Sequence, residues 1–387
     1  MFIEDYVSKA TDPFPPRAYL ALPPIASGSD RLFKGHTVGI KPVSFNALTA
    51  SERDRFLGTF LRYEMLCKVY NPPVWNIIKD THYAHLLSEA HEKLLPTELK
   101  ALQCVREYVK AVYGAVFSHL QDAWLPDRPV ASPSEPFSTK GLLPRTKYGL
   151  LYPDTVYFSA VDYFKTVNDT SSYRLADILP CLGFDLLTHI LVSFNKDGRY
   201  GQYLKTWLYA FTKQLGSYCS PWSFGEHFFS RYEKSIAFDS AIFFRGLQQE
   251  SCRNRSATLQ LHRHRQSYWQ AINDRDPWAR QQNQHELQLM IYRQRAWGFF
   301  DDTRLYPDTA KHFPTIDDLD EQERIAGKSM APCYERSRRR SQRWQDWYSG
   351  RCIESPLDEE RQEPLREVEA VEDNYDDLPR FFGKPSP

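Results

Sequence analysis

Apolar side chains recur at helical spacing along much of this chain, and this periodicity constrains its fold more than any other feature. The clearest stretch is 199–216, which ends at Gly216, a residue type that commonly terminates helices. Its apolar positions are Tyr200, Tyr203, Leu204, Trp207, Leu208, Phe211 and Leu215. No stretch alternates convincingly between apolar and polar residues, so the sequence predicts an all-α fold without βαβ units.

The same periodicity predicts a series of helices after residue 50. Ser51 is the expected cap of the first, which the Asn71-Pro72-Pro73 segment ends, and Pro180 is expected to kink or split a later one. The predicted helices are 51–70, 74–95, 97–124, 153–167, 174–195, 199–216, 222–248 and 249–295. The predicted core residues are Phe60, Val109, Ile190, Trp207 and Phe211.

Composition divides the chain into three parts. With 387 residues, of which 42% are hydrophobic, the chain can bury a substantial core. We predict one irregular multi-helix domain over 46–330, with a proline-rich connection at 126–150. Residues 1–45, rich in proline and glycine, predict an extended arm. Residues 331–387 are charged and poor in large apolar side chains, which predicts a disordered tail.

Targeting and cysteine patterns favour a cytoplasmic or nuclear protein. The first residues lack the basic start and apolar stretch of a secretory signal, and the longest apolar stretch, 182–194, is too short to span a membrane. The seven cysteines are odd in number and lack a Cys-x-x-Cys pair, so neither a disulfide framework nor a zinc ribbon is expected. No membrane partner is predicted.

Catalytic and cofactor motifs give no lead. The chain has no Gly-x-Ser-x-Gly, no Gly-x-Gly-x-x-Gly and no phosphate-binding Gly-Lys-Ser/Thr loop. His262 and His264 lie two residues apart, so on a helix their side chains point in different directions and cannot share a tetrahedral metal site. We therefore predict no catalytic residue, no metal and no cofactor.

Asp301 and Asp302 form the one acidic pair that invites comparison with an enzyme. Aspartates on helices hold magnesium in all-helical terpene cyclases, which bind diphosphates. That chemistry needs another carboxylate about one helical turn further on, but Thr303, Arg304 and Leu305 follow here. A terpene-cyclase-like enzyme is therefore an alternative hypothesis that the residues disfavour, and a turn or helix cap is the simpler interpretation.

A cluster of arginines is the sharpest charged feature. Five fall within eight positions, and we call them the arginine cluster: Arg336, Arg338, Arg339, Arg340 and Arg343. Such a cluster is typical of a nuclear import signal or a phosphate-binding patch. The competing interpretation is a solvated stretch that pairs with the acidic run at 358–377.

The region 250–295 is also basic, which supports an alternative function. Together with 336–343 it would serve a nucleic-acid-associated protein, with Trp269, Trp278 and Trp344 available for stacking on bases. The formal net charge of zero weighs against this hypothesis.

Several strings resemble a group of uncharacterised proteins of filamentous ascomycete fungi. The strings are Phe60-Leu61-Arg62-Tyr63-Glu64, Cys104-Val105-Arg106-Glu107-Tyr108 and Tyr292-Arg293-Gln294-Arg295-Ala296-Trp297. The resemblance covers about residues 50–313 and implies a helical fold but no activity. Some such proteins are labelled F-box-like, although no Leu-Pro-x-Glu opening precedes the first helix here. The leading hypothesis is a non-enzymatic intracellular helical interaction protein whose protein partner is unknown.

Overall fold

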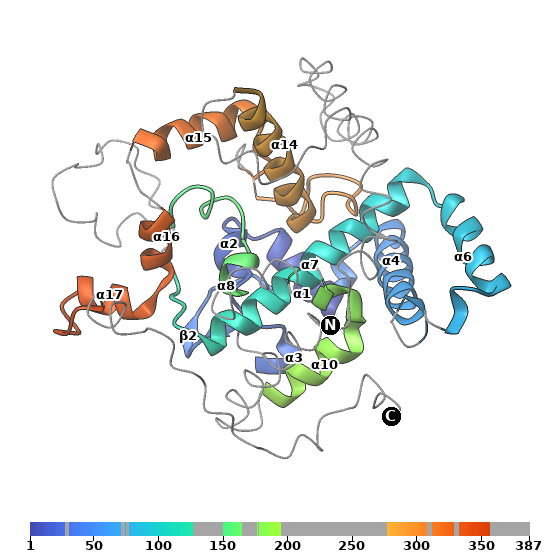
Figure 1. The fold of residues 1–387 in the computed structure, drawn as a ribbon, viewed down its shortest axis with the longest axis horizontal. Helices are drawn as coiled ribbons and strands as arrows, with labels where there is room; N and C mark the ends of the chain where they lie inside the picture. The colour runs from blue at the N-terminus through green and yellow to red at the C-terminus, as the bar shows by residue number, and fades with distance from the viewer. Residues whose placement is uncertain are drawn as a thin grey trace.

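The all-α prediction is confirmed by the structure, a computed structural model (Figure 1). In its described part, strands form only a two-stranded antiparallel sheet, β1 (Leu32–Phe33) with β2 (His36–Thr37). The structure describes residues 1–27, 31–70, 74, 77–126, 150–164, 176, 178–194, 277–307, 312–328 and 333–356. The predicted helices at 199–216 and 222–248, with the core residues Trp207 and Phe211, lie outside these ranges.

The helices range from single turns to seven turns. Among the described residues, the 3₁₀ helices η1 (Phe45–Ala47) and η4 (Leu179–Leu182) accompany them. The α-helices are α1 (Phe2–Ala10), α2 (Pro15–Ala18), α3 (Pro24–Ser27), α4 (Ala50–Val69), α6 (His82–Glu92), α7 (Pro96–Leu120), α8 (Val161–Phe164), α10 (Gly183–Phe194), α14 (Pro277–Gln294), α15 (Ile316–Lys328), α16 (Cys333–Arg340) and α17 (Gln342–Tyr348).

Helix α7 forms the centre of the molecule and is buried on nearly all sides. Cys104 and Tyr113, which lie on opposite sides of its axis, are both fully inaccessible to solvent. A helix that is buried on both sides must be surrounded by other elements, and α4, α8, α14 and η4 pack against it. Figure 1 shows α7 crossing the middle of the fold.

The predicted extended arm at 1–45 is wrong, because its first part is a helix within the core. Tyr6 of α1 is fully buried, and its ring stacks on Tyr108 of α7 with 4.7 Å between ring centres. Its hydroxyl donates to the carbonyl of Arg293 in α14. The apolar residues of α1 recur at helical spacing, but the helix is only nine residues long and the proline-rich sequence around α2 follows it.

Helix boundaries follow caps that the sequence pattern misplaces. Thr49, rather than the predicted Ser51, caps α4, since its Oγ1 accepts a hydrogen bond from the N–H of Glu52 at 3.2 Å. In return the Glu52 carboxylate accepts the N–H of Thr49 at 2.9 Å, which completes a capping box. The other predicted ends also shift. Helix α7 ends at Leu120, and within the described part of the predicted helix 153–167, which is 153–164, α8 covers 161–164.

Elsewhere the periodicity locates the core correctly. Phe60, Val109 and Ile190 are buried as predicted, with exposed fractions of 9%, 0% and 2%. Pro180 lies in η4, and α10 begins directly after it at Gly183. The split that was predicted at Pro180 within the helix 174–195 is therefore confirmed. Gly183 has a positive φ of 79°, a conformation that glycine adopts without strain.

Gly114 marks the closest approach between α7 and the segment before α8. A Cβ atom at this position would lie 2.7 Å from the Cβ of Ala160 and 3.0 Å from the Phe158 ring. We expect Gly114→Ala to destabilise the fold by roughly 1–3 kcal/mol through overpacking, measured by urea denaturation. Gly58 in α4 is the matched control, because a Cβ there meets nothing within 4 Å. Equal effects of Gly114→Ala and Gly58→Ala would contradict this packing.

Candidate interaction face

One side of helix α4 carries apolar side chains that face solvent. Leu57, Leu61 and Met65 follow one another at intervals of four residues, with exposed fractions of 51%, 65% and 59%. At about 100° per residue, these side chains and their exposed neighbours fall within a sector of about 100°. We call this sector the α4 stripe, and its members are Asp54, Leu57, Gly58, Leu61, Met65 and Lys68.

The opposite side of α4 explains why this helix cannot turn its stripe inward. Phe56, Phe60 and Tyr63 are buried against the core, and Phe56 stacks on Phe299 with 4.1 Å between ring centres. The Tyr63 hydroxyl donates to the carbonyl of Pro180 at 2.5 Å. Because these contacts fix the rotation of α4 about its axis, Leu57, Leu61 and Met65 remain outside.

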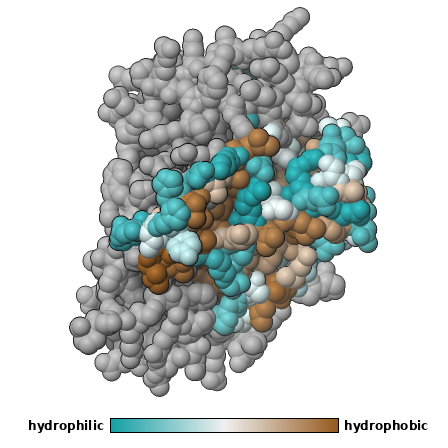
Figure 2. All heavy atoms as spheres, turned by 90° about the vertical axis from the view of Figure 1, so that its right-hand side faces the viewer, coloured by the Kyte–Doolittle hydropathy of each residue, from teal (hydrophilic) through white to brown (hydrophobic). Residues whose placement is uncertain are grey.

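Exposed apolar side chains are concentrated around this stripe. In the described part of the chain, twelve large hydrophobic residues are exposed, and eight of them lie between residues 57 and 95. They include Ile77, Tyr83 and Leu86, which are 74%, 68% and 45% exposed on or before α6. Figure 2 looks onto the side of the molecule that carries α4 and α6 and shows apolar surface gathered there. Contiguous exposed apolar surface of this kind marks interaction sites on proteins.

Gly58 leaves one position of the α4 stripe, between Leu57 and Leu61, without a side chain. Glycine within a helix costs roughly 0.5–1 kcal/mol relative to alanine, and no neighbouring group requires it, since a Cβ there would meet nothing within 4 Å. A missing side chain on an exposed helix face lets another backbone approach closely. The fold of the single chain therefore does not account for Gly58.

The arginine cluster takes a different place from the one predicted. It lies on α16 and α17 rather than in a disordered tail, so the predicted tail at 331–387 is wrong for its first part. The main chain between these helices bridges to the end of α7, where the N–H of Trp124 donates to the carbonyl of Arg340 at 2.7 Å. Residues 357–387, which contain the acidic run 358–377, lie outside the described residues.

Each arginine of the cluster contacts another group of the fold. Arg339 is 4% exposed with its Nε 3.5 Å from Glu335, and Arg338 lies 4.2 Å from the centre of the Trp344 ring. The remaining contacts join Arg336 to the carbonyl of Tyr152, Arg340 to Asp154 and Asp162, and Arg343 to Asp122. The cluster therefore anchors α16 and α17, and acids of the fold lie beside Arg339, Arg340 and Arg343.

Arg340 makes the most buried of these contacts. Its guanidinium pairs with Asp154, whose side chain is 4% exposed, and lies 2.8 Å from Asp162. Burial raises the pKa of Asp154 above its ordinary value even though Arg340 lies beside it. The sequence missed this site because residues 154 and 340 are far apart in the chain and nothing in the sequence pairs them.

We expect Arg340→Met to destabilise the protein by about 3–5 kcal/mol, because it leaves the Asp154 carboxylate buried without its cation. Urea denaturation measures the loss. Arg338→Met is the matched control, since Arg338 stacks on Trp344 and pairs with no buried acid in the described contacts. The double variant Arg340→Met/Asp154→Asn should recover part of the loss. A loss below about 1 kcal/mol for Arg340→Met would show that the pair is not structural.

Asp301 and Asp302 are bound to arginines instead of facing a shared cavity. Asp301 pairs with Arg55 at 2.5 Å and accepts the hydroxyl of Thr49 at 2.9 Å, and Asp302 lies 2.8 Å from Arg304. Arg304 also donates to Glu52, which is fully buried at the start of α4. Asp302 also accepts the N–H of Arg304 at 3.0 Å, so the pair lies in a turn, the first of the two simpler interpretations. In the described part of the chain, no group of three His, Cys, Asp or Glu side chains gathers as metal ligands would.

Glu52 should make stability depend on acid pH. Burial alone would raise its pKa, but hydrogen bonds from Arg304 and from the N–H groups of Asp301 and Thr49 lower it from 4.5 to about 2. The folded state therefore favours the carboxylate, and its contribution to stability, present above pH 4.5, is lost as the pH falls towards 2. We expect the difference in melting temperature between wild type and Glu52→Gln to shrink over that interval. A difference that stays constant would contradict this.

The basic region 250–295 is described only from 277. Within it, Arg295 is 3% exposed and donates to the carbonyl of Val156 at 2.8 Å, so it is a core residue. Burial lowers the pKa of its guanidinium to about 9. Trp344 is 3% exposed and covered by Arg338, so it cannot stack on a base. Residues 250–276, with Trp269, lie outside the described residues.

The described cysteines Cys67, Cys104 and Cys181 are reduced and buried. Burial raises the pKa of Cys104 to about 12, so it stays protonated and unreactive near neutral pH.

Comparisons with known proteins provide no family for this chain. No protein-family model matches it, and no curated protein or solved structure matches it either. The resemblance to uncharacterised fungal proteins therefore stays a prediction. Of the helices that the structure describes, none combines the length and apolar character that crossing a membrane requires. The α4 stripe is left as the surface from which a function can be argued, and the sequence signal for it was the presence of apolar residues on both sides of one helix.

Proposed function

We propose that this protein is a helical interaction protein that pairs with a second copy of itself through the α4 stripe. The observation that carries the proposal is the row of exposed Leu57, Leu61 and Met65 beside Gly58 on a helix whose other face is fixed in the core. Helices with a narrow apolar row associate by packing those rows together, so the natural occupant of the stripe is another helix.

The stripe is complementary to itself when two copies of α4 run antiparallel. With Leu61 at the twofold axis, Leu57 lies opposite Met65 of the second copy and Asp54 lies opposite Lys68. Every contact then occurs twice, as in an isologous interface. Asp54 and Lys68 are about 21 Å apart along the helix, so about one turn of apolar contact lies on either side of the axis, with the charged pair one turn further out. Gly58 lets the two helices approach closely.

The charges at the ends of the α4 stripe and the exposed area around it fit a second copy of the chain. Asp54 and Lys68 carry opposite charges at the two ends of the stripe, and both are exposed. Lys68 also pairs with Glu64 and Asp185, so its contribution across the interface sets orientation more than affinity. A stable interface buries about 800 Å² on each partner, and the exposed residues of α6 on the same side of the molecule supply area beyond the stripe (Figures 1 and 2).

Sedimentation velocity over a range of concentrations tests the pairing. We expect wild type to form a dimer, and Leu61→Arg to be monomeric with an unchanged melting temperature for the monomer, because two arginines would meet at the axis. Ile353→Arg is the matched control, since Ile353 is 96% exposed far from α4 in the sequence and should leave the dimer intact. A monomeric wild type at all concentrations would overturn the proposal.

Two further variants separate self-pairing from other uses of the stripe. Asp54→Lys should weaken the dimer, because it places a cation opposite Lys68 of the second copy, and Asp54→Asn should weaken it less. Gly58→Ala should stabilise the monomer, by up to about 1 kcal/mol, and weaken the dimer. If Leu61→Arg instead unfolds a monomeric protein, another segment of the same chain covers the stripe. If wild type is a soluble monomer that Leu61→Arg leaves unchanged, the occupant is not a second copy.

A further inference from the structure

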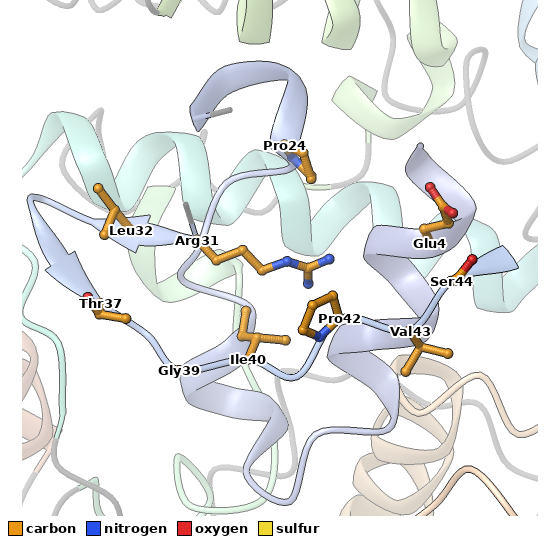
Figure 3. Close-up of a pocket in the computed structure, with 10 residues that line it drawn as sticks. All are labelled: Glu4, Pro24, Arg31, Leu32, Thr37, Gly39, Ile40, Pro42, Val43 and Ser44. Carbon is orange, nitrogen blue, oxygen red and sulfur yellow. The ribbon is translucent and has the colours of Figure 1, made fainter. Parts of the chain in front are cut away.

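A cleft between α1 and the segment after α3 is unrelated to the α4 stripe. Its volume is about 610 Å³, within the range of small-molecule sites. Arg31 lies beside it with Pro24, Ile40 and Pro42 as apolar walls, and Glu4 lies at its far side (Figure 3). In Figure 3 the Arg31 side chain extends between Pro24 on one side and Ile40 and Pro42 on the other, so that its guanidinium reaches the middle of the cleft.

The guanidinium of Arg31 is buried without a hydrogen bond. Its side chain is 10% exposed, and its Nη1 is inaccessible to solvent and finds no hydrogen-bond acceptor among the described residues. The nearest acid is Asp5, whose Oδ1 lies 3.7 Å away, beyond hydrogen-bonding distance. A buried donor that lacks an acceptor is costly. Nη1 faces Asp5, and the guanidinium that carries it extends into the cleft (Figure 3).

Asp5 cannot fully neutralise Arg31, because other groups already bind it. Its Oδ2 accepts the Tyr108 hydroxyl at 2.9 Å and lies 2.8 Å from the Nζ of Lys9. Both Asp5 and Lys9 are completely buried. Two buried cations therefore share one buried carboxylate, and the group leaves one positive charge that faces the cleft.

We propose that this cleft binds a small monocarboxylate with an apolar chain. The planar fork of a guanidinium matches a carboxylate, which can accept two parallel hydrogen bonds from it. The single excess charge of the Asp5, Lys9 and Arg31 group calls for one negative charge. The chain of the ligand would lie along Ile40 and Pro42.

Glu4 sets the charge limit of the ligand. Its carboxylate accepts the N–H of Phe45 at 3.0 Å at the far side of the cleft and remains 42% exposed. A second negative group on the ligand, or the higher charge of phosphate, would meet this carboxylate. The cleft should therefore favour a monocarboxylate over a dicarboxylate of similar size and over phosphate.

Isothermal titration calorimetry with hexanoate, succinate and inorganic phosphate tests the proposal on the full chain. We expect hexanoate to bind wild type at one site, with succinate and phosphate at least tenfold weaker. Arg31→Gln should weaken hexanoate binding at least tenfold, and Arg31→Lys should weaken it less, since it keeps the charge and loses the fork. Glu4→Gln should keep hexanoate binding and strengthen succinate binding.

Loss of folding would not hide the answer. If Arg31→Gln unfolds, Pro42→Trp, which enlarges an exposed residue of the apolar wall and fills the cleft, should abolish hexanoate binding in a folded protein. The proposal is overturned if hexanoate does not bind wild type, if Arg31→Gln or Pro42→Trp binds it as well as wild type does, or if phosphate binds as tightly as hexanoate.

Discussion

The burial of α7 is the constraint on which the rest of the structure depends. A helix with apolar or small residues on every side cannot face solvent, so the chain has to supply covers for it from several regions. Helix α4 covers one side, α14 another, and α1 completes the enclosure through the stacking of Tyr6 on Tyr108. Because α1 and α14 are far apart in the chain, this core is complete only when both helices pack against α7. The fold is therefore one cooperative unit around α7.

Buried carboxylates join these covers to one another in defined positions. Glu52 at the start of α4 is held by Arg304, and Asp154 before α8 is held by Arg340. A buried ion pair contributes little net stability over an apolar pair, but removing one partner is costly. Such pairs therefore select the arrangement in which every buried acid meets its cation. Arg31 differs from these arginines, because the acid nearest to it is already bound to Lys9 and Tyr108.

Sequence patterns predicted those features that depend on neighbours along the chain. The periodicity that identified α4 and α7 reflects apolar residues that recur at helical spacing, and Phe60 and Val109 are buried as predicted. Features that depend on distant partners were not predictable in this way. The arginines at 336–343 resemble a solvated tail in the sequence, because the acids that pair with Arg340 and Arg343 come from residues 122–162. The extended-arm prediction for α1 was wrong for a similar reason, because the burial of this short helix depends on its contact with α7.

For helix α4, apolar periodicity alone does not predict which face is available for binding. Apolar residues occupy both of its faces, and the pattern alone does not decide which face enters the core. The aromatic side, with Phe56 and Phe60, wins because its rings stack on partners from α10 and from the segment after α14. The aliphatic side then remains exposed. A single exposed residue such as Val192 needs no explanation, but three in register beside a glycine form a surface that a second helix can cover.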